Sequence, residues 1–457
     1  MRAAFVIPWY GRDIPGGAEA MCRLTAENLA QRGADVEVLT TCLHSLEKSW
    51  DQDHHQPGET IEAGVRVRRF SVDPRNVGLF ALLNDRLVRG ETLKPSEQRA
   101  FLENMVNSKA LDDYIAQAQD CLFFPLPYLF STTWRTIRLR PEASVPITCL
   151  HDEGYAYLDP IREAFLAAAG VVFLSPAERE LAADIWDLPE EKALFLAGGV
   201  ETEPLGEAGR FRRRYNLTDP FLLYAGRRDA TKNTPFLIDC FAGYKKERAG
   251  PLKLVLIGNL PVEIPEGLKG EVIDLGFLPA QDKLDAMAAA AVFCQPSLNE
   301  SYSIVIMEAW LNHTPVMVHG DCAVTTEYVL ASGGGLTFTD QAGFNQALDQ
   351  LLGQEEAARM AEAGREYVLA TMSWEAVCGR YIDLLQGGLR PAVQPAARPR
   401  PRAIHQVISH LAAHDALGDE TLLIRRRLRE KNIRSHIYAD HIDVRVRRFA
   451  RPLERFE

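Results

Sequence analysis

The sequence predicts an α/β protein with two Rossmann-like domains. The first observation is the start of the chain, where an apolar strand over residues 3–8 leads through a glycine loop into a helix over 18–32. The second is the same order of elements further along, with an apolar strand over 221–226, a polar turn and a helix over 235–248. Strands and helices that alternate in this way form parallel sheets covered by helices. The length of 457 residues is enough for about two to three domains.

The composition indicates an ordinary globular protein. Hydrophobic residues make up 47% and charged residues 25% of the chain, which is typical of such proteins. A formal net charge of −11 argues against a general nucleic-acid binder. The apolar run at residues 1–8 is too short for a secretory signal, and no apolar stretch is long enough to cross a bilayer. The eight cysteines are scattered without a C-x-x-C pair, so we expect free thiols and a cytoplasmic location.

The loop after the first strand contains Gly16 and Gly17. Two adjacent glycines let the backbone approach a ligand closely, and the helix that follows offers N–H groups to an anion. A Gly-Gly pair by itself is usually only a turn, and the G-x-G-x-x-G pattern of dinucleotide-binding enzymes is absent. The position directly after the first strand favours the ligand-binding interpretation.

His151 follows an apolar run over 146–150 that predicts a further strand. A histidine at the carboxyl end of a parallel strand points into the ligand crevice of an open α/β sheet. A structural role, with the imidazole paired to the neighbouring Asp152, is equally compatible with the sequence.

A second group of polar residues, Asp-Gln-Asp-His-His at 51–55, imitates a D-x-D metal-binding motif. It lies beside a Pro-Gly pair in a polar stretch, which favours a solvated loop over a metal site. We therefore expect no bound metal.

Arg227 and Lys232 lie in the turn between the strand and the helix that open the second domain. Two cations held at such a turn suit a diphosphate, with arginine as a planar fork and lysine as a point charge. Taken singly, Arg227 or Lys232 could equally be an ordinary charged residue on the surface.

Glu300 and Glu308 flank the expected start of a helix at Ile304. A helix N-terminus favours an anion, and Ser301 and Ser303 can cap it with their hydroxyls. At a rise of about 1.5 Å per residue, the two carboxylates lie on the order of 10 Å apart. That separation is too long for a retaining hydrolase pair, but it suits a long ligand such as a sugar nucleotide. The alternative is that Glu300 is an ordinary charged residue of a loop and Glu308 a solvated carboxylate on a helix.

The segment from Glu300 to Glu308 resembles the E-x7-E motif of retaining glycosyltransferases of the GT-B fold, glycosyltransferase family 4. The surrounding Pro-Ser-Leu-Asn-Glu-Ser-Tyr-Ser-Ile-Val-Ile-Met-Glu-Ala-Trp is similar to bacterial members that build surface polysaccharides such as O-antigen. The common form has glycines where this chain has Ser301 and Ser303. Gly226-Arg227 with Lys232 five residues after Arg227 resembles the diphosphate clamp of the same family.

The resemblance implies two Rossmann-like domains that face each other across a cleft, and a set of site residues. The expected catalytic residues are Glu300, Arg227, Lys232 and His151, and the expected donor-binding residues are Gly16, Gly17, Arg227, Lys232, Ser303, Ile304 and Glu308. Glu300 would orient the transferred sugar and Glu308 would accept hydrogen bonds from the ribose hydroxyls. The two cations and the helix start would stabilise the leaving diphosphate in place of a metal ion.

The expected activity is retaining transfer of a hexosyl group, mannosyl being one option, from a nucleoside diphosphate sugar. The expected acceptor is a glycan or lipid-linked glycan in surface polysaccharide synthesis, with no cofactor beyond the co-substrate. A sugar-nucleotide epimerase of the same architecture and a non-catalytic partner subunit are the alternatives. We expect a cytoplasmic protein that also contacts the inner face of the membrane peripherally.

The expected domains are an acceptor-side domain over 1–198, a nucleotide-sugar domain over 199–388, a Pro/Arg-rich linker over 389–402 and an extension over 403–457. The extension repeats the strand–helix–strand order of the start of the chain. This order favours the truncated start of a second glycosyltransferase unit. A basic tail whose cationic helix face binds a membrane surface or an acidic partner is the alternative.

Overall fold

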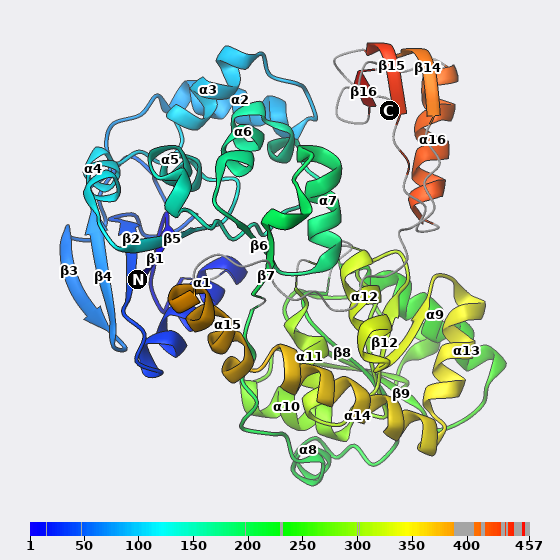
Figure 1. Cartoon of the computed structure of the whole chain (residues 1–457). Coiled ribbons are helices and arrows are strands. Elements are labelled where there is room, and N and C mark those ends of the chain that lie inside the picture. The colour runs from blue at the N-terminus through cyan, green and yellow to red at the C-terminus, as the bar shows by residue number, and fades with distance from the viewer. Residues whose placement is uncertain are drawn as a thin grey trace. The chain divides into compact units, whose positions relative to one another are not determined.

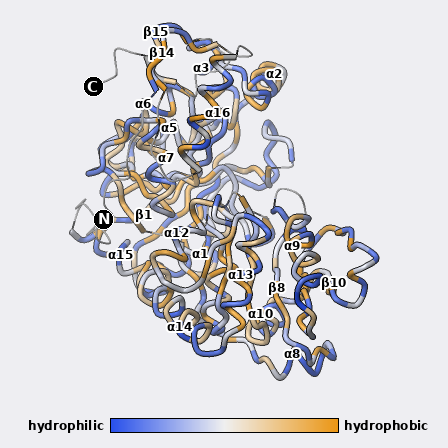
Figure 2. Tube along the Cα trace, turned by 90° about the vertical axis from the view of Figure 1, so that its right-hand side faces the viewer, coloured by the Kyte–Doolittle hydropathy of each residue, from blue (hydrophilic) through white to orange (hydrophobic). Residues whose placement is uncertain are grey.

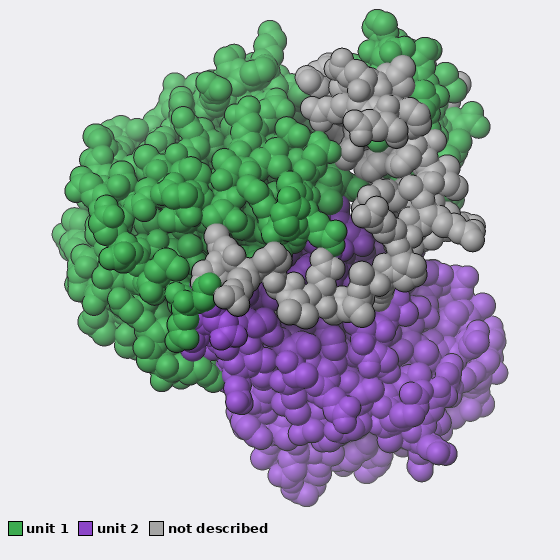
Figure 3. Space-filling view, viewed as in Figure 1, with its two compact units in different colours: residues 1–172, 181–194, 385–457 green, residues 173–180, 195–384 purple. Residues whose placement is uncertain are grey.

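The computed structural model describes residues 1–14, 16–46, 48–196, 198–228, 232–298, 300, 302–387, 406–412, 416–430, 435, 437–442 and 450–452. The chain divides into two compact units (Figure 3). Unit 1 comprises residues 1–172, 181–194 and 385–457, and unit 2 comprises residues 173–180 and 195–384. The chain passes between the units at 172/173, 180/181, 194/195 and 384/385, and the domain boundary at 198/199 stays a prediction.

Unit 1 contains a five-stranded sheet in the order β3-β4-β2-β1-β5. Its interior strand β1 pairs in parallel with β2 on one side and with β5 on the other. Five of the six β1 residues are buried, as expected for a strand covered on both faces. Only β3 runs antiparallel to its neighbour. The strands are β1 (Arg2–Ile7), β2 (Val36–Thr41), β3 (Gly58–Glu62), β4 (Val65–Phe70) and β5 (Cys121–Pro125).

The helices between residues 76 and 167 belong to unit 1, and the helix over 176–186 begins in unit 2 and ends in unit 1; Figure 1 labels these helices. The segment over 76–120 is mostly helical. The elements are α1 (Gly17–Gln31), α2 (Val77–Val88), α3 (Pro95–Glu103), α4 (Lys109–Gln117), α5 (Ser131–Leu139), α6 (Asp159–Ala167) and α7 (Pro176–Trp186), with a two-stranded sheet of β6 (Val171–Phe173) and β7 (Ala193–Phe195).

Unit 2 contains a six-stranded parallel sheet in the order β10-β9-β8-β11-β12-β13. The chain builds outward from β8 through β9 to β10, then returns to the centre and builds the other way from β11. Neighbouring strands β8 and β11 therefore define a topological switch point, where open α/β sheets bind ligands beyond their carboxyl ends. The strands are β8 (Phe221–Ala225), β9 (Lys253–Ile257), β10 (Val272–Gly276), β11 (Val292–Gln295), β12 (Val316–His319) and β13 (Gly335–Phe338).

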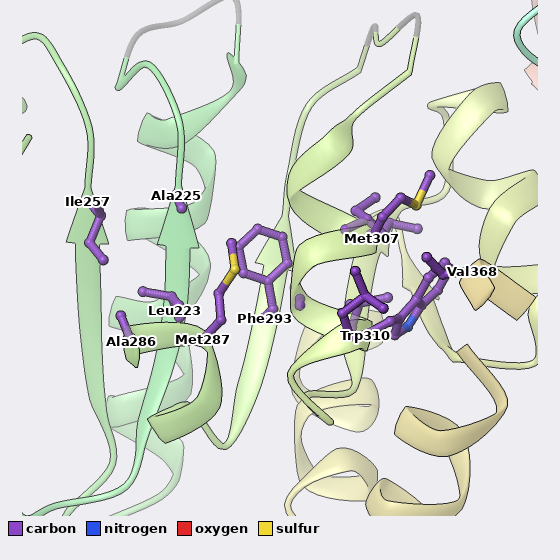
Figure 4. Packing of buried hydrophobic residues seen from close by; sticks show 14 of the residues in the cluster. Leu223, Ala225, Ile257, Ala286, Met287, Phe293, Met307, Trp310 and Val368 are labelled. Carbon is purple, nitrogen blue, oxygen red and sulfur yellow. The ribbon is translucent and has the colours of Figure 1, made fainter. Parts of the chain in front are cut away.

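Two hydrophobic clusters cover the two faces of this sheet. Successive side chains of a strand point to opposite faces, so Leu223 belongs to one cluster and Leu222 to the other. In the first cluster, Met307 and Trp310 of one helix pack with Val368 of another (Figure 4). The helices are α8 (Ala208–Tyr215), α9 (Thr234–Glu247), α10 (Ala280–Ala289), α11 (Ile304–Leu311), α12 (Ala323–Ser332), α13 (Gln341–Leu351), α14 (Gln354–Thr371) and α15 (Trp374–Gly387).

The hydropathy of these helices follows their burial. Along α13 and α14, hydrophilic and hydrophobic residues alternate in short groups (Figure 2), and in α13 the buried set includes Phe344, Leu348 and Leu351. This spacing is that of a helix with one face on a core. No helix among the described residues is both long and apolar enough to span a membrane.

The described part of the extension has the strand–helix–strand order that the sequence predicts. It comprises β14 (Gln406–Leu411), α16 (Ala416–Glu430), β15 (Ile437–Ile442) and β16 (Ala450–Pro452). The strands form a parallel sheet in the order β14-β15-β16, and β1, β2 and β4 of unit 1 pair in the corresponding order. The predicted linker over 389–402 lies outside the described residues, and a second glycosyltransferase unit stays a prediction.

Candidate active site

Two polar turns meet at the switch point of unit 2. β8 and β11 are parallel neighbours, with Leu222 opposite Val292 and Leu223 opposite Phe293. The turn after β8 contains Arg227 and Lys232, and the turn after β11 contains Glu300. Parallel strands end at the same edge of a sheet, so these distant stretches of sequence lie at one place.

Lys232 and Glu300 contact each other directly. Nζ of Lys232 lies 2.7 Å from Oε1 of Glu300, and the two side chains are 23% and 9% exposed. Gln295, the buried last residue of β11, donates from Nε2 to Oε1 of Glu300 at 3.4 Å and to Oγ of Ser303 at 3.1 Å. Gln295 thus links two predicted site residues. The sequence analysis missed it, although a polar residue that ends the apolar run Val-Phe-Cys-Gln is a recognisable signal.

The two adjacent arginines after β8 have different environments. Arg227 is exposed at the turn, whereas Arg228 is buried. The guanidinium of Arg228 binds the carboxylate of Asp274, and its backbone N–H donates to the carbonyl of Asn259 at 3.1 Å. Arg228 therefore ties the ends of β8, β9 and β10 together, and the exposed position of Arg227 suits contact with a ligand.

A contact between two glycines fixes the turn after β8. Gly258, which follows β9, has φ 142°, and a Cβ atom added to it would lie 1.7 Å from the carbonyl oxygen of Gly226. The backbone N–H of Gly226 donates to the carbonyl of Ile257 at 2.9 Å. Only glycine fits at position 258, because both the backbone conformation and the space exclude a side chain.

Helix α11 begins in the turn after β11, as predicted, but its cap differs from the prediction. Ser303 is the N-cap residue and has φ 55° and ψ 58°, in the left-handed region, and its side chain makes no capping hydrogen bond. A capping serine normally has an extended backbone, which directs its hydroxyl at the N–H groups of the first turn. The prediction that Ser303 caps α11 with its hydroxyl is therefore wrong, and this hydroxyl accepts from Gln295 instead. Ser301 lies outside the described residues.

Glu308 of α11 is paired with a lysine that the sequence analysis missed. Nζ of Lys283, in α10, lies 2.6 Å from both carboxylate oxygens of Glu308, and the two side chains are 25% and 18% exposed. Glu308 is therefore not a freely solvated helix carboxylate. No local pattern indicates this pair, because the partners lie on different helices, 25 positions apart in the sequence.

The glycine pair of unit 1 lies at the start of α1, as predicted. Gly16 is the N-cap residue with φ 147°, and an added Cβ would lie 2.0 Å from Oε2 of Glu19. Glu19 is held in turn by Trp9, whose Nε1 donates to its Oε1 at 2.7 Å. Among the described residues, and apart from its chain neighbours and the backbone of its own helix, no atom lies within 4 Å of a Cβ built on Gly17. The backbone at Gly16 requires glycine, and Gly17 leaves space above the helix start.

His151 is exposed and does not follow a regular strand. The predicted strand over 146–150 is wrong: Ile147 forms only an isolated bridge with Val172, and Cys149 has φ 51°, a left-handed conformation that a strand cannot contain. The alternative pairing also finds no support, since the carboxylate of Asp152 accepts from the hydroxyl of Tyr157 at 2.7 Å. The catalytic role of His151 stays a prediction.

The loop over 51–55 has structural contacts. Oδ1 of Asp53 accepts from the backbone N–H of Val72 at 2.9 Å, and the ring of His44 stacks on that of His55. Among the described residues, no group of three or more histidine, cysteine, aspartate or glutamate side chains is placed to hold a metal ion.

Comparisons with known proteins agree with this fold. Residues 207–367, which contain Arg227, Lys232, Glu300 and Glu308, match the family model "Glycosyl transferases group 1". A D-inositol 3-phosphate glycosyltransferase from Stackebrandtia nassauensis is 23% identical over 411 residues, which cover 82% of this chain and 88% of the relative.

Solved structures show the same architecture. Sucrose-phosphate synthase from Thermosynechococcus elongatus superimposes with a TM-score of 0.58 at 19% identity, over 84% of this chain and 98% of that one. Anabaena Alr3699/HepE in complex with UDP-glucose superimposes with a TM-score of 0.54 at 16% identity, over 85% of this chain and all of that one. The chain has the GT-B fold predicted from its sequence. Together with the family match, this fold supports glycosyl transfer as the general activity.

Proposed function

We propose that this protein is a retaining glycosyltransferase that takes a hexosyl group from a nucleoside diphosphate sugar. The observation that carries the proposal is the meeting of Lys232, Glu300 and the start of α11 at the switch point of unit 2. A cation and a helix N-terminus attract the diphosphate, while a carboxylate beside them accepts hydrogen bonds from sugar hydroxyls. The complex of Anabaena Alr3699/HepE with UDP-glucose supports a nucleotide sugar as the ligand of this fold.

The proposed chemistry separates a cationic sugar from a departing diphosphate. Arg227, Lys232 and the N–H groups at Ser303 and Ile304 stabilise the negative charge that develops on the leaving phosphate. The bond from the anomeric carbon to the phosphate oxygen breaks, and the acceptor oxygen bonds to the same face of that carbon. The leaving phosphate oxygen takes the proton of the acceptor hydroxyl. The stereochemistry is retained, and no nucleophile from the protein is needed.

The remaining contacts orient the donor. Glu300 binds hydroxyls of the transferred sugar, and Glu308 accepts from the ribose hydroxyls. These assignments follow the resemblance of the E-x7-E segment to glycosyltransferase family 4. The same resemblance assigns donor binding to Gly16 and Gly17 and a catalytic role to His151.

We further propose a glycan or lipid-linked glycan acceptor in surface polysaccharide synthesis, at the cytoplasmic face of the membrane. The relative from Stackebrandtia nassauensis glycosylates D-inositol 3-phosphate according to its name, so acceptors in this fold vary. Both glycans and small polyol phosphates are therefore to be tried as acceptors in a transfer assay.

The test is a transfer assay with labelled sugar nucleotides, run with and without acceptor. A thermal-shift screen with GDP, UDP, ADP and dTDP first selects the nucleotide. The proposal is supported if transfer requires an acceptor, if an α-linked donor gives an α-linked product, and if the activity persists in EDTA. Epimerised donor without acceptor would instead indicate a sugar-nucleotide epimerase, and binding without turnover of any donor would indicate a non-catalytic subunit. Lys232→Ala is the matched inactive control, because it removes the proposed diphosphate contact.

A further inference from the structure

The pair formed by Lys283 and Glu308 joins two helices of unit 2 beside the proposed nucleotide site. Both carboxylate oxygens of Glu308 lie 2.6 Å from Nζ of Lys283, so the ammonium bridges them symmetrically. Lys283 lies in the first turn of α10, where its backbone N–H donates to the carbonyl of Pro279 at 3.0 Å. The pair is short but not deeply buried, at 25% and 18% side-chain exposure.

The surroundings make this pairing specific. Glu308 is the one charged residue of α11, whose sequence is Ile-Val-Ile-Met-Glu-Ala-Trp-Leu. Lys283 is likewise the one basic residue of α10. The two carboxylates of α10 have other partners: Asp282 binds Arg214, and Asp285 binds Arg210. The bridge between Lys283 and Glu308 is therefore a local contact rather than one link of a wider surface network.

The geometry leaves Glu308 able to bind a diol. A carboxylate has about four lone-pair sites, two on each oxygen. The ammonium of Lys283 occupies one site on each oxygen, and one site on each remains to accept from the two vicinal hydroxyls of a ribose. An ammonium has three N–H donors, so Lys283 can also donate to a ribose oxygen while it holds the carboxylate in one orientation.

The charge of Lys283 has a second consequence. Glu308 lies four residues beyond the start of α11, which is about 6 Å along the helix axis. An uncompensated carboxylate at that distance would repel a diphosphate bound at the helix start. Lys283 cancels this charge and leaves the hydrogen-bonding capacity of the carboxylate in place.

We propose that Lys283 is a positioning residue for ribose recognition, which acts by fixing and neutralising the carboxylate of Glu308. The inference rests on the proposed function, since it takes a nucleoside diphosphate as the ligand of unit 2. Lys283 lies outside the E-x7-E segment. Its proposed role gives the site a preference for a ribose that has both hydroxyls.

The test compares two ligands by isothermal titration calorimetry on the full chain. The ligands are the nucleoside diphosphate that stabilises the wild-type protein most and its 2′,3′-dideoxy analogue. In Lys283→Met, we expect the ribonucleotide to lose at least 10-fold more affinity than the dideoxy analogue, whose smaller loss reports the uncompensated charge of Glu308 near the diphosphate. Lys283→Arg should restore most of the ribonucleotide affinity. Lys269→Met is the matched control, because Lys269 forms an exposed pair with Glu266 at 2.6 Å in the same unit and should leave both affinities unchanged.

Several outcomes would overturn the inference. An equal loss for both ligands would mean that Lys283 acts only as a positive charge, and tighter ribonucleotide binding would mean that it competes with ribose for Glu308. Dideoxy binding also reports whether the variant is folded, so a misfolded protein is not mistaken for a positive result. If the wild-type protein binds none of the nucleoside diphosphates, the proposed function itself fails. If the wild type binds and prefers ribose but Lys283→Met is unchanged, only the role of Lys283 fails.

Discussion

Lys232 and Glu300, 68 positions apart in the sequence, form an ion pair with 2.7 Å between Nζ and Oε1. They meet because β8 and β11, whose turns they occupy, are neighbours in the sheet of unit 2. In the proposed reaction, Lys232 binds the diphosphate and Glu300 binds the transferred sugar. The pairing holds the lysine beside the turn that leads into α11. In the proposed reaction, the two opposite charges would lie at the two ends of the scissile bond.

Replacement of Lys232 by alanine is expected to lower turnover at least 100-fold. That factor corresponds to about 2.7 kcal/mol of lost transition-state stabilisation, which is reasonable for one charged contact with a leaving phosphate. The measurement is kcat and kcat/KM with the donor identified by the transfer assay. Lys269→Ala, which removes a lysine from an exposed pair with Glu266, is the control. Undiminished turnover in Lys232→Ala would reject the proposed clamp.

Replacement of Glu308 by alanine is expected to act mainly on nucleotide binding. The variant loses the acceptor for the ribose hydroxyls and leaves Lys283 without its partner carboxylate. Hydrogen bonds to charged groups contribute about 1.5–3 kcal/mol, so the dissociation constant for the nucleoside diphosphate should rise on the order of 10- to 100-fold. Calorimetric titration of the diphosphate measures this directly, and an unchanged constant would contradict the ribose role.

Ser303 offers a test of the backbone at the start of α11. Its φ of 55° is left-handed, a conformation that costs an L-residue about 1–2 kcal/mol and costs glycine almost nothing. Ser303→Gly and Ser303→Ala both lose the hydroxyl that binds Gln295, so the difference between them isolates the backbone. We expect Ser303→Gly to be more stable than Ser303→Ala by about 1 kcal/mol in urea denaturation. Equal stabilities, or a more stable alanine variant, would mean that another conformation is adopted there.

Much of the fold and part of the candidate site could be predicted from the sequence. The apolar strands, the glycine loop and the helices of both units are signalled by local patterns, so their positions in the chain were predictable. Lys232 and Glu300 were expected in one site because the segments that contain them both resemble glycosyltransferase family 4, and the structure adds that the parallel strands before them are neighbours. The resemblance of the E-x7-E segment then supplied their expected roles.

The features that the sequence did not predict depend on contacts between distant elements. The bridge from Lys283 to Glu308 requires α10 and α11 to pack with a definite register, which no local pattern records. The hydroxyl of Ser303 was expected to cap a helix, but the left-handed backbone turns it toward Gln295. The prediction of a strand before His151 is wrong for a related reason. The apolar run has the composition of a strand, but Cys149 adopts a left-handed backbone conformation that a strand does not contain.

Gly258 is predicted to be essential for the turn that carries Arg227. In Gly258→Ala, a Cβ atom would meet the carbonyl of Gly226 at 1.7 Å, and φ 142° would be strained as well. We expect a loss of about 2–4 kcal/mol in the free energy of unfolding, together with weaker nucleotide binding. Two controls separate backbone strain from the steric clash. Gly270 has φ 80° but open space around an added Cβ, and Gly250 has neither a positive φ nor a close neighbour. In urea denaturation, the loss in the free energy of unfolding should be about 1 kcal/mol for Gly270→Ala and less than about 0.5 kcal/mol for Gly250→Ala.

The contact between α8 and α10 predicts how the stability of unit 2 depends on pH. Asp285 of α10 accepts from Nη2 of Arg210 at 2.6 Å, from the backbone N–H of Glu207 at 2.9 Å and from Nε2 of Gln281 at 3.0 Å. Burial by itself would raise the pKa of this carboxyl, but the hydrogen bonds from Arg210, Gln281 and Glu207 outweigh it and hold the pKa below its usual value of 3.8.

A carboxyl with a lowered pKa in the folded state binds fewer protons there than in the unfolded state. Its contribution to stability is therefore fully present above the usual pKa and is lost as the pH falls through the folded value. We expect the thermal midpoint of the wild-type protein to fall below about pH 4, and Asp285→Asn to have a lower midpoint at pH 7 with a shallower fall. Glu266→Gln, at a side chain that is 84% exposed, should follow the wild-type curve. Parallel curves for the wild type and Asp285→Asn would show that other carboxylates control the acid transition of this unit.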